Sequence, residues 1–568
     1  MRPETDRDLG SLDPSTPIEA TIVLRPLSDA RLAARVDDVA LLHPARRTPM
    51  SSSDASEIGD PGDTAIRRIR ELAERHGVEV VDVSRSRHDV VVRGTAERLS
   101  AMFRVELREF HDGKRRYRAH DGPLLIHEDA APHVLGVVGL DTVPIHHRVA
   151  APHGGGVRLS PAELLEHYRF PDVDTSSHRI AVLQFGGGFH RSDLDAFASR
   201  FDVELPEINV VSVPGSSGDP PANAPLAPDR LKAIAEKWRD GVTMKELGRL
   251  YGTDMVTFMS TMEVTMDIEL VSALGGGATI DVLFAPPGAD GWRRAIYRAL
   301  GEPQAPDEGA SEPLPTVISA SWGASERSLG ANQLSLIHRA LVAALRRGVA
   351  VCCSSGDFGA NNSFENPEQL NVNFPASSPA TLACGGSRIV SPDEATEAAW
   401  SGDHGGAHMA TGGGMSGYFR RPVWQTGLDR DPLAGTWVAP ERGDGFGGRW
   451  LPDVAAVAAL DAGPEIVVGD TVLSGGGTSA ATPLWACLLL RLAAVCGHPM
   501  SDLAPWLYDR GTSCALRDVV SGDGNLENGA PFYRAGPAWD PCTGWGTPDG
   551  QALVDALRSS RAAADNTA

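Results

Sequence analysis

Ser479 has the surroundings expected of a nucleophile. Three glycines stand just ahead of it in DTVLSGGGTSAATPLWA, residues 470–486, and an apolar stretch that predicts a helix follows. A nucleophilic serine needs a tight turn, a base that takes its proton, and donors for the oxyanion. The glycines permit close backbone approach, and a helix that begins at the serine directs its positive end toward developing negative charge. The segment predicts a nucleophile, although a glycine turn before a core helix explains the same pattern.

The base for Ser479 is not an obvious histidine. The segment GTSAATP resembles the nucleophile segment of the subtilisin-like fold, in which the histidine usually stands in an H-G-T-H setting. The histidines beyond residue 180 all lack these neighbours: His190, His338, His404, His408 and His498. The proton of Ser479 therefore needs another acceptor.

The alternative base is a carboxylate pair in TMEVTMDIELVSAL, residues 261–274. Glu263 and Asp267 are four residues apart, which places both on one face of a helix, where each disfavours the ionisation of the other. Such a pair can handle protons as a unit. A solvated acidic face is the ordinary explanation of this spacing, but apolar neighbours argue against an exposed face: Val264, Met266, Ile268, Leu270 and Val271.

Asp357 is the candidate for stabilising the oxyanion. It stands in CCSSGDFGA, residues 352–360, in a glycine turn after a predicted buried strand. An aspartate in this position can simply cap the turn. If it faces Ser479 in protonated form, it can donate a hydrogen bond to an oxyanion.

These segments together resemble a known family. EVTMD, SSGDFGA and GGGTSAATP, in this order, resemble the sedolisin family of serine-carboxyl peptidases, particularly its kumamolisin-like branch. The similarity runs from about residue 20 to about residue 555, and includes IAVLQFGGGF, ISASWG, TGGGMSGYFRRPVWQ and LPDVAAVA. The resemblance implies a subtilisin-like catalytic domain behind an activation domain, and hence a zymogen that cleaves itself.

The resemblance also implies a role for each candidate residue. Ser479 would be the nucleophile, Glu263 its general base, Asp267 the residue that holds Glu263 and shares its charge, and Asp357 the oxyanion donor. A glutamate with a pKa of about 4.3 still accepts protons in acid, where a histidine is already charged. This chemistry favours activity in acid, and the resemblance implies an endopeptidase that acts on polypeptides, is a monomer, and is extracellular.

A calcium site is implied near the C-terminus. RDVVSGDGN and RAGPAWDPCTGWG resemble the family's site for one structural Ca²⁺ ion, which two aspartates and three carbonyls bind. The matching positions are Asp518 and Asp540 for carboxylates, and Val519, Gly536 and Ala538 for carbonyls. Hard oxygen ligands in a glycine-rich loop suit Ca²⁺. Ala538 stands where glycine is expected, and an aspartate-capped loop without metal is the alternative.

Two features depart from the family pattern. Gln184 follows IAVL where kumamolisin-like members often have a glutamate that, with the tryptophan matching Trp322, extends the carboxylate network. Glutamine hydrogen-bonds but does not titrate, so the pH profile can differ. Residues 222–258 predict an inserted helical pair just before Glu263, which can reshape substrate access.

The elements that position these residues indicate two domains. Residues 1–150 alternate apolar strand and helix patterns, including one strand over VEVVDVSRSRHDVVVRG, and predict a small α+β, ferredoxin-like activation domain. Residues 151–178 form a linker and processing region. Residues 179–560 alternate strands and helices, which predicts an α/β domain with a central parallel sheet and a site beyond the carboxyl ends of its strands.

Composition excludes several classes of protein. The net charge of −22 argues against a nucleic-acid partner, and residues 1–155 hold 22 Lys and Arg against 25 Asp and Glu, so the acidic excess lies in the larger part of the chain. No segment is long and apolar enough to span a membrane, and no standard signal peptide is visible. The seven cysteines predict buried thiols at Cys352 and Cys353, and a bridge from Cys514 to Cys542 stays open.

Twelve of the 17 histidines fall within residues 1–178, including His146, His147 and His153 near the expected cleavage at 148–158. Histidine gains charge between pH 7 and 5, so acidification could loosen the activation domain, although incidental surface histidines explain the count as well. Two other functions stay open for the chain. One is a non-catalytic, calcium-dependent peptide-binding protein on the same fold, and the other a conventional subtilase or esterase.

Overall fold

The computed structural model describes residues 7–25, 38–42, 44, 61–85, 87–111, 116–120, 122–143, 158–214, 223–302, 313–361, 370–392, 395–404, 407–429, 448–511, 515–522, 526–527, 530–531 and 533–565. Some sequence-based predictions lie outside these residues. They are the roles of His146, His147 and His153, nearly all of the expected cleavage region, and a bridge from Cys514.

The N-terminal domain is ferredoxin-like, as predicted. Its four-stranded antiparallel sheet has the order β3-β4-β2-β7, built in the chain order strand, helix, strand, strand, helix, strand. The elements are β2 (Pro17–Leu24), α3 (Gly62–Arg75), β3 (Glu79–Ser84), β4 (Asp89–Thr95), α4 (Ala96–Phe103) and β7 (Val134–Val138). A second sheet joins β1 (Arg7–Ser11), β5 (Leu107–His111) and β6 (Arg116–His120).

One strand prediction in this domain is wrong. The stretch VEVVDVSRSRHDVVVRG is a hairpin and not a single strand, because the chain reverses between the end of β3 at Ser84 and the start of β4 at Asp89. His88 there has a φ of 55°, in the left-handed region typical of turns. Residue alternation is the same along both arms of a hairpin, so it does not reveal the reversal.

The C-terminal domain is built on an eight-stranded sheet in the order β16-β15-β13-β11-β8-β10-β9, with β21 also paired to β15. All these pairs are parallel except that of β15 with β16. This confirms the predicted central parallel sheet. The strands are β8 (Arg179–Gln184), β9 (Ile208–Ser212), β10 (Thr279–Phe284), β11 (Val317–Ala320), β13 (Ala350–Ser354), β15 (Leu382–Ser391), β16 (Thr396–Ala399) and β21 (Val454–Val457).

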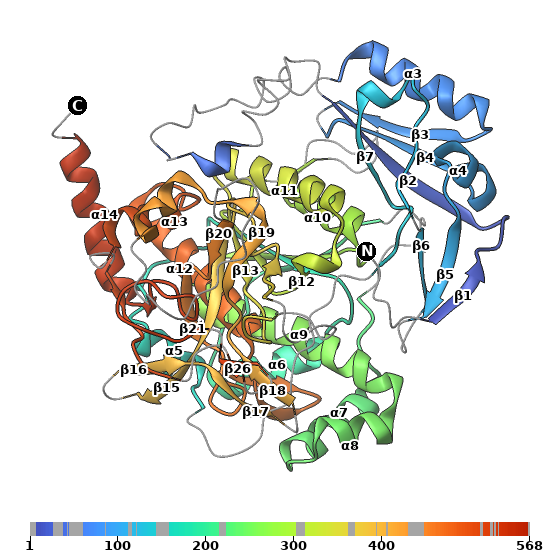
Figure 1. The fold of residues 1–568 in the computed structure, drawn as a ribbon. Helices are drawn as coiled ribbons and strands as arrows, with labels where there is room; N and C mark the ends of the chain where they lie inside the picture. The colour runs from blue at the N-terminus through green and yellow to red at the C-terminus, as the bar shows by residue number, and fades with distance from the viewer. Residues whose placement is uncertain are drawn as a thin grey trace.

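Helices cover both faces of this sheet (Figure 1). On one face α9 (Thr253–Leu274) packs against α12 (Thr478–Cys496), and α10 (Ala289–Ala299) pairs with α11 (Ala331–Arg346) on the other. Further helices are α5 (Pro161–His167), α6 (Arg191–Phe201), α13 (Leu503–Arg510) and α14 (Gly550–Asp565). Within the described residues α12 is the one helix long and apolar enough to cross a membrane, and 83% of its apolar window is buried, as in a core helix.

Short antiparallel pairs of strands lie outside the main sheet of this domain. They are β12 (Ala324–Ser325) with β14 (Asn373–Phe374), β17 (Ser401–His404) with β18 (Ala407–Ala410), β19 (Gly414–Arg420) with β20 (Gly448–Leu451), β22 (Glu465–Val468) with β23 (Thr471–Ser474), β24 (Leu516–Arg517) with β27 (Thr547–Pro548), and β25 (Leu526–Glu527) with β26 (Ala530–Pro531). The β22–β23 hairpin matters most here because it leads directly into the glycines before Ser479.

The predicted insertion contains the helices α7 (Pro228–Arg239) and α8 (Met244–Tyr251). Thr243 caps α8 and forms a reciprocal capping box with Glu246, which explains where this helix begins. The interval 222–258 also includes the first turns of α9, which begins at Thr253. The inserted pair therefore continues into the helix that carries Glu263.

The N-terminal domain rests on α10 and α11 (Figure 1). Asp89 of β4 and Arg293 of α10 form a fully buried ion pair across this interface, 2.7 Å between Nη1 and Oδ2. Arg293 also donates to the main-chain oxygen of Arg87 at 2.8 Å. A second point of attachment is η1 (Asp38–Leu41), where Trp424 Nε1 of the C-terminal domain donates to the Ala40 oxygen at 3.1 Å.

Candidate active site

Ser479 lies in the first turn of α12 and is completely buried. The helix begins after Gly477, whose φ of 75° is one that residues with a side chain rarely adopt. A Cβ at Gly477 would stand 2.7 Å from Asp357 Oδ2, so glycine is what lets these two segments approach. The Ser479 hydroxyl donates to the main-chain oxygen of Ser321 at 3.3 Å.

Glu263 and Asp267 lie near the middle of α9, which packs against α12. Both side chains are buried, with exposures of 2% and 0%. The acidic pair is therefore not a solvated helix face. Its burial explains the apolar residues that flank it in the sequence.

Asp267 is held by two donors. Ser321 Oγ donates to Oδ1 and Gln184 Nε2 donates to Oδ2, each at 2.7 Å. Trp322 Nε1 donates to Gln184 Oε1 at 2.7 Å, which fixes the orientation of the glutamine amide, because an indole N–H can only donate. Gln184 is the last residue of β8, and Ser321 and Trp322 directly follow β11, so all three lie at the edge of the sheet where the sequence predicts a site.

Glu263 has a different environment. Among the described residues neither of its carboxyl oxygens has a hydrogen bond of normal geometry. Burial raises the pKa of Glu263 well above its ordinary value of 4.5, and the charges of Asp267 and Asp357 raise it further. The nearby Ser479 hydroxyl lowers it. Glu263 is thus the member of the pair that holds a proton most readily.

Asp267 is the better carrier of negative charge in the pair. Burial raises its pKa as well, but the hydrogen bonds from Ser321 and Gln184 oppose that rise. Two carboxyls that interact this closely lose their protons in two separate steps, with a singly charged pair between them. The site can therefore hold one negative charge next to Ser479 over a range of pH.

Asp357 caps α12. Its Oδ1 accepts from the backbone N–H of Thr478 at 2.7 Å and from the Thr478 hydroxyl at 2.8 Å. Its Oδ2 lies on the side of Gly477. One oxygen of Asp357 is therefore bonded to the start of α12, and the other lies beside Gly477, the residue two positions before Ser479.

Sequence reasoning missed Ser321. Its hydroxyl holds Asp267, and its main-chain oxygen accepts from Ser479, so it links base and nucleophile. The signal available was its place in ISASWG, directly after a buried strand, but a serine among small residues carries no distinctive spacing. Only the contact across the sheet identifies it.

The predicted calcium ligands also come together. Both carboxylates contact the 536–538 loop, since Ala538 N donates to Asp518 Oδ2 at 2.8 Å and Gly536 N to Asp540 Oδ2 at 3.2 Å. Burial raises the pKa of Asp518 and brings that of Asp540 to about 7. Ala538 has a φ of 65°, which explains why glycine was expected there. Asp540 Oδ1 also accepts from the N–H groups of Cys542 and Thr543, as in an aspartate-capped loop, so the Ca²⁺ site stays a prediction.

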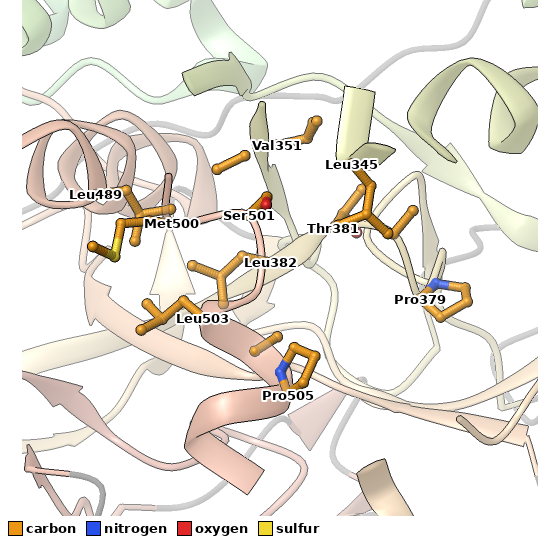
Figure 2. A pocket seen from close by; sticks show the side chains of 13 residues that line it. Leu345, Val351, Pro379, Thr381, Leu382, Leu489, Met500, Ser501, Leu503 and Pro505 are labelled. Carbon is orange, nitrogen blue, oxygen red and sulfur yellow. The ribbon is translucent and has the colours of Figure 1, made fainter. Parts of the chain in front are cut away.

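A small pocket elsewhere is unrelated to this chemistry. It lies at the amino-terminal ends of β13 and β15, lined mainly by apolar side chains that include Leu345, Leu382, Leu489 and Leu503 (Figure 2). The candidate active site is at the other edge of the sheet, at the carboxyl ends of β8, β11 and β13. The pocket is therefore not where a peptide would meet Ser479.

Comparison with known proteins gives a consistent result. Residues 5–143 match the family model described as "Pro-kumamolisin, activation domain". The chain is 31% identical to kumamolisin from Bacillus sp. (strain MN-32), over 97% of this chain and 94% of that protein. It is 26% identical to tripeptidyl-peptidase 1 of Bos taurus, over 97% and 93% of the two chains. The structure of Pseudomonas sedolisin, a serine-carboxyl proteinase complexed with pseudo-iodotyrostatin, aligns with a TM-score of 0.54 and 24% identity, covering 72% of this chain and 99% of that one.

Proposed function

Because the chain belongs to the sedolisin family of serine-carboxyl peptidases, we propose that it is an acid-active endopeptidase in which Ser479 attacks peptide bonds with Glu263 and Asp267 as its base. The chain is a serine peptidase zymogen with a pro-kumamolisin activation domain. The observation that supports these catalytic roles best is the buried carboxyl pair beside Ser479, in which two hydrogen-bond donors hold Asp267.

The proposed reaction begins from the singly charged pair. As Ser479 attacks the carbonyl carbon, Glu263 takes its proton and Asp267 takes over the proton that the pair already holds, so the negative charge passes to the oxyanion. Protonated Asp357 donates a hydrogen bond to that oxyanion. Glu263 then returns a proton to the leaving amine, and water repeats the sequence on the acyl-enzyme.

The same assignment accounts for activity in acid. The base needs one negative charge on the pair, whereas Asp357 has to be protonated in order to donate. A carboxyl group is protonated only near or below its pKa, ordinarily about 4. Asp357 sets the acid requirement, because it loses its proton as the pH rises, and the two requirements together predict a bell-shaped dependence of the rate on pH.

The relatives do not decide between endopeptidase and tripeptidyl-peptidase activity. Kumamolisin shares more identity with this chain than tripeptidyl-peptidase 1 does, 31% against 26%. A tripeptidyl-peptidase needs the free amino end of its substrate. A long peptide with a blocked amino end therefore separates the two activities: an endopeptidase cleaves it internally, and a tripeptidyl-peptidase leaves it intact.

A structural Ca²⁺ ion is also part of the proposal. Asp518 and Asp540 would hold it with the main-chain oxygens of Val519, Gly536 and Ala538. The ion would supply positive charge beside Asp540, whose ionised form burial disfavours. We further propose, from the family resemblance alone, that the enzyme acts as an extracellular monomer.

The decisive experiment follows self-cleavage and peptide hydrolysis by purified protein between about pH 3 and about pH 7, where the carboxyls titrate. We expect Ser479→Ala and Glu263→Gln to lose both activities. The exposed Glu204→Gln is a matched control that should keep them. Full cleavage by Ser479→Ala or Glu263→Gln would contradict the mechanism and favour another nucleophile or base.

A further inference from the structure

Glu269 is a third buried carboxyl on α9, two residues beyond Asp267. Its Oε2 accepts from the backbone N–H of Val467 at 2.9 Å. In the part of the chain that the structure describes, its Oε1 has no hydrogen-bond partner. A carboxyl with a single backbone contact in a core is costly, and the proposed reaction gives it no role.

Val467 belongs to β22, the first strand of the hairpin that leads to the nucleophile. The hairpin turns at Gly469 and Asp470, whose φ values of 59° and 57° are both left-handed, and β23 then runs to Ser474. Both turn N–H groups donate to Asp193 of α6, at 3.1 and 3.3 Å. Glu269 thus fixes the body of the hairpin while Asp193 fixes its tip.

The connection from the hairpin to Ser479 is also tightly packed. Gly475 N donates to the Pro464 oxygen at 2.7 Å, and a Cβ at Gly475 would stand 2.8 Å from the sulfur of Met266. Met266 is the neighbour of Asp267 on α9. The chain from Val467 to Ser479 is therefore held against the helix that carries the proposed base.

We propose that Glu269 is a positioning residue: by binding the Val467 N–H, it fixes the hairpin that carries Ser479 to the helix that carries Glu263. The inference rests on the proposed function, because it assumes that these two residues react. It extends that function by naming what sets the distance between them. A displacement of about 1 Å can cost about 100-fold in rate, so the anchor should affect catalysis more than substrate binding.

The surroundings of Glu269 explain why it suits an acid enzyme. Burial raises its pKa well above 4.5, the Val467 N–H opposes this, and the charge of Asp193 adds to it. Burial likewise raises the pKa of Asp193, and the charge of Asp470 adds to this rise. The turn N–H groups and His190 lower the pKa. Asp470 is itself paired with Lys232 on the exposed side of the hairpin. As the pH falls both carboxyls take up protons, which reduces the repulsion between them.

The test compares Glu269→Leu with Glu269→Gln. Leucine removes the acceptor and leaves the Val467 N–H unpaired, whereas glutamine keeps an acceptor of the same length but does not titrate. We expect Glu269→Leu to lower kcat per active site by at least about 10-fold, with KM within about twofold. Glu269→Gln should keep the wild-type kcat in acid and lose less of it toward neutral pH. Glu465→Leu, on the same hairpin, is the control and should keep kcat.

Unchanged kcat in Glu269→Leu, or equal loss in both variants, would overturn the inference. If Glu269→Leu does not fold, Asp193→Ala decides: it removes the anchor at the tip and should lower kcat, and unchanged kcat there overturns the inference as well. Ser479→Ala is measured in parallel. Residual activity in it would remove the proposed function, whereas an inactive Ser479→Ala beside a fully active Glu269→Leu removes only the role of Glu269.

Discussion

Gln184 donates its side-chain amide to Asp267 across 2.7 Å, and this places a residue that cannot titrate next to the carboxyl that best carries the charge of the pair. Its amide is turned toward Asp267 because Trp322 occupies the other end. A hydrogen bond to the charged form lowers the pKa of a carboxyl. Gln184 therefore favours an ionised Asp267 without adding a titration of its own.

Removing this donor should shift the pH profile. In Gln184→Leu the pKa of Asp267 rises, so the singly charged pair forms only at higher pH. A hydrogen bond to a charged group contributes about 1.5 kcal/mol, which corresponds to about one pH unit. We expect the acid limb of kcat/KM to move up by about that much, and we would measure it with a peptide substrate across the acid range.

Two further variants check this explanation. Trp322→Phe leaves the glutamine in place but frees its orientation, so the acid limb should move in the same direction by less. Gln184→Glu adds a third carboxyl whose charge would repel Asp267, so it should add a titration step to the profile. An acid limb that stays in place in Gln184→Leu would mean that Asp267 does not carry the charge of the pair.

The sequence predicts the parts of this site that have local signatures. Glycines before Ser479 and the four-residue spacing of Glu263 and Asp267 are read along one segment, and the alternation of strands and helices predicts the parallel sheet. Ser321 and Glu269 have no such signature, because each acts through a partner about 150 or more residues away in the chain. The β3–β4 turn was missed for the opposite reason, since its local pattern fits one strand as well as two.

The buried pair of Asp89 and Arg293 predicts how the activation domain is held. Burial would raise the pKa of Asp89, but Arg293 and Arg87 outweigh it and hold the pKa below its ordinary value of 3.8. A carboxyl with a lowered pKa stabilises the contact above 3.8, and that contribution is lost as the pH falls through the lowered value. Acid should therefore weaken the attachment of the activation domain.

Asp89→Asn should imitate this loss at every pH. It leaves Arg293 buried without its carboxylate partner, and removal of one member of a buried ion pair typically costs about 3–5 kcal/mol. We expect self-cleavage to begin at higher pH or after a shorter lag, measured by the appearance of the processed chain. Arg116→Gln, which breaks only an exposed pair within the activation domain, should leave the onset unchanged. If self-cleavage of Asp89→Asn begins at the wild-type pH and after the wild-type lag, the pair of Asp89 and Arg293 does not control activation.

A histidine trigger makes a separable prediction. Substitution of His146, His147 and His153 by glutamine removes charges that form between about pH 7 and about pH 5. If those charges loosen the activation domain, the triple variant should need a lower pH for self-cleavage or show a longer lag. This shift in the pH at which self-cleavage begins is opposite to the one expected for Asp89→Asn. An unchanged profile in the triple variant would exclude these three histidines.

Ala538 predicts a stabilising substitution. Its φ of 65° costs a residue with a Cβ roughly 1 kcal/mol that glycine does not incur, while its N–H keeps Asp518 in place in either case. Ala538→Gly should raise the melting temperature and tighten Ca²⁺ binding. Ala535→Gly, in the same loop without a positive φ, should lower stability through the added freedom of the unfolded chain. Equal effects of the two substitutions would mean that strain at residue 538 is unimportant.

If Asp540 binds Ca²⁺ as proposed, removal of the ion should matter most at neutral pH. Burial brings the pKa of Asp540 to about 7 without a metal, so the protein freed of Ca²⁺ gains stability as the pH falls from above 7 toward 3.8, where the carboxyl becomes neutral. Binding of Ca²⁺ needs the ionised form and therefore contributes most above pH 7. Thermal unfolding with and without a chelator should show a large difference in melting temperature near pH 7.5 and a smaller one near pH 5. Asp540→Asn removes the titration, so the melting temperature should respond little to chelator at either pH; a response like that of the wild type would place the ion elsewhere.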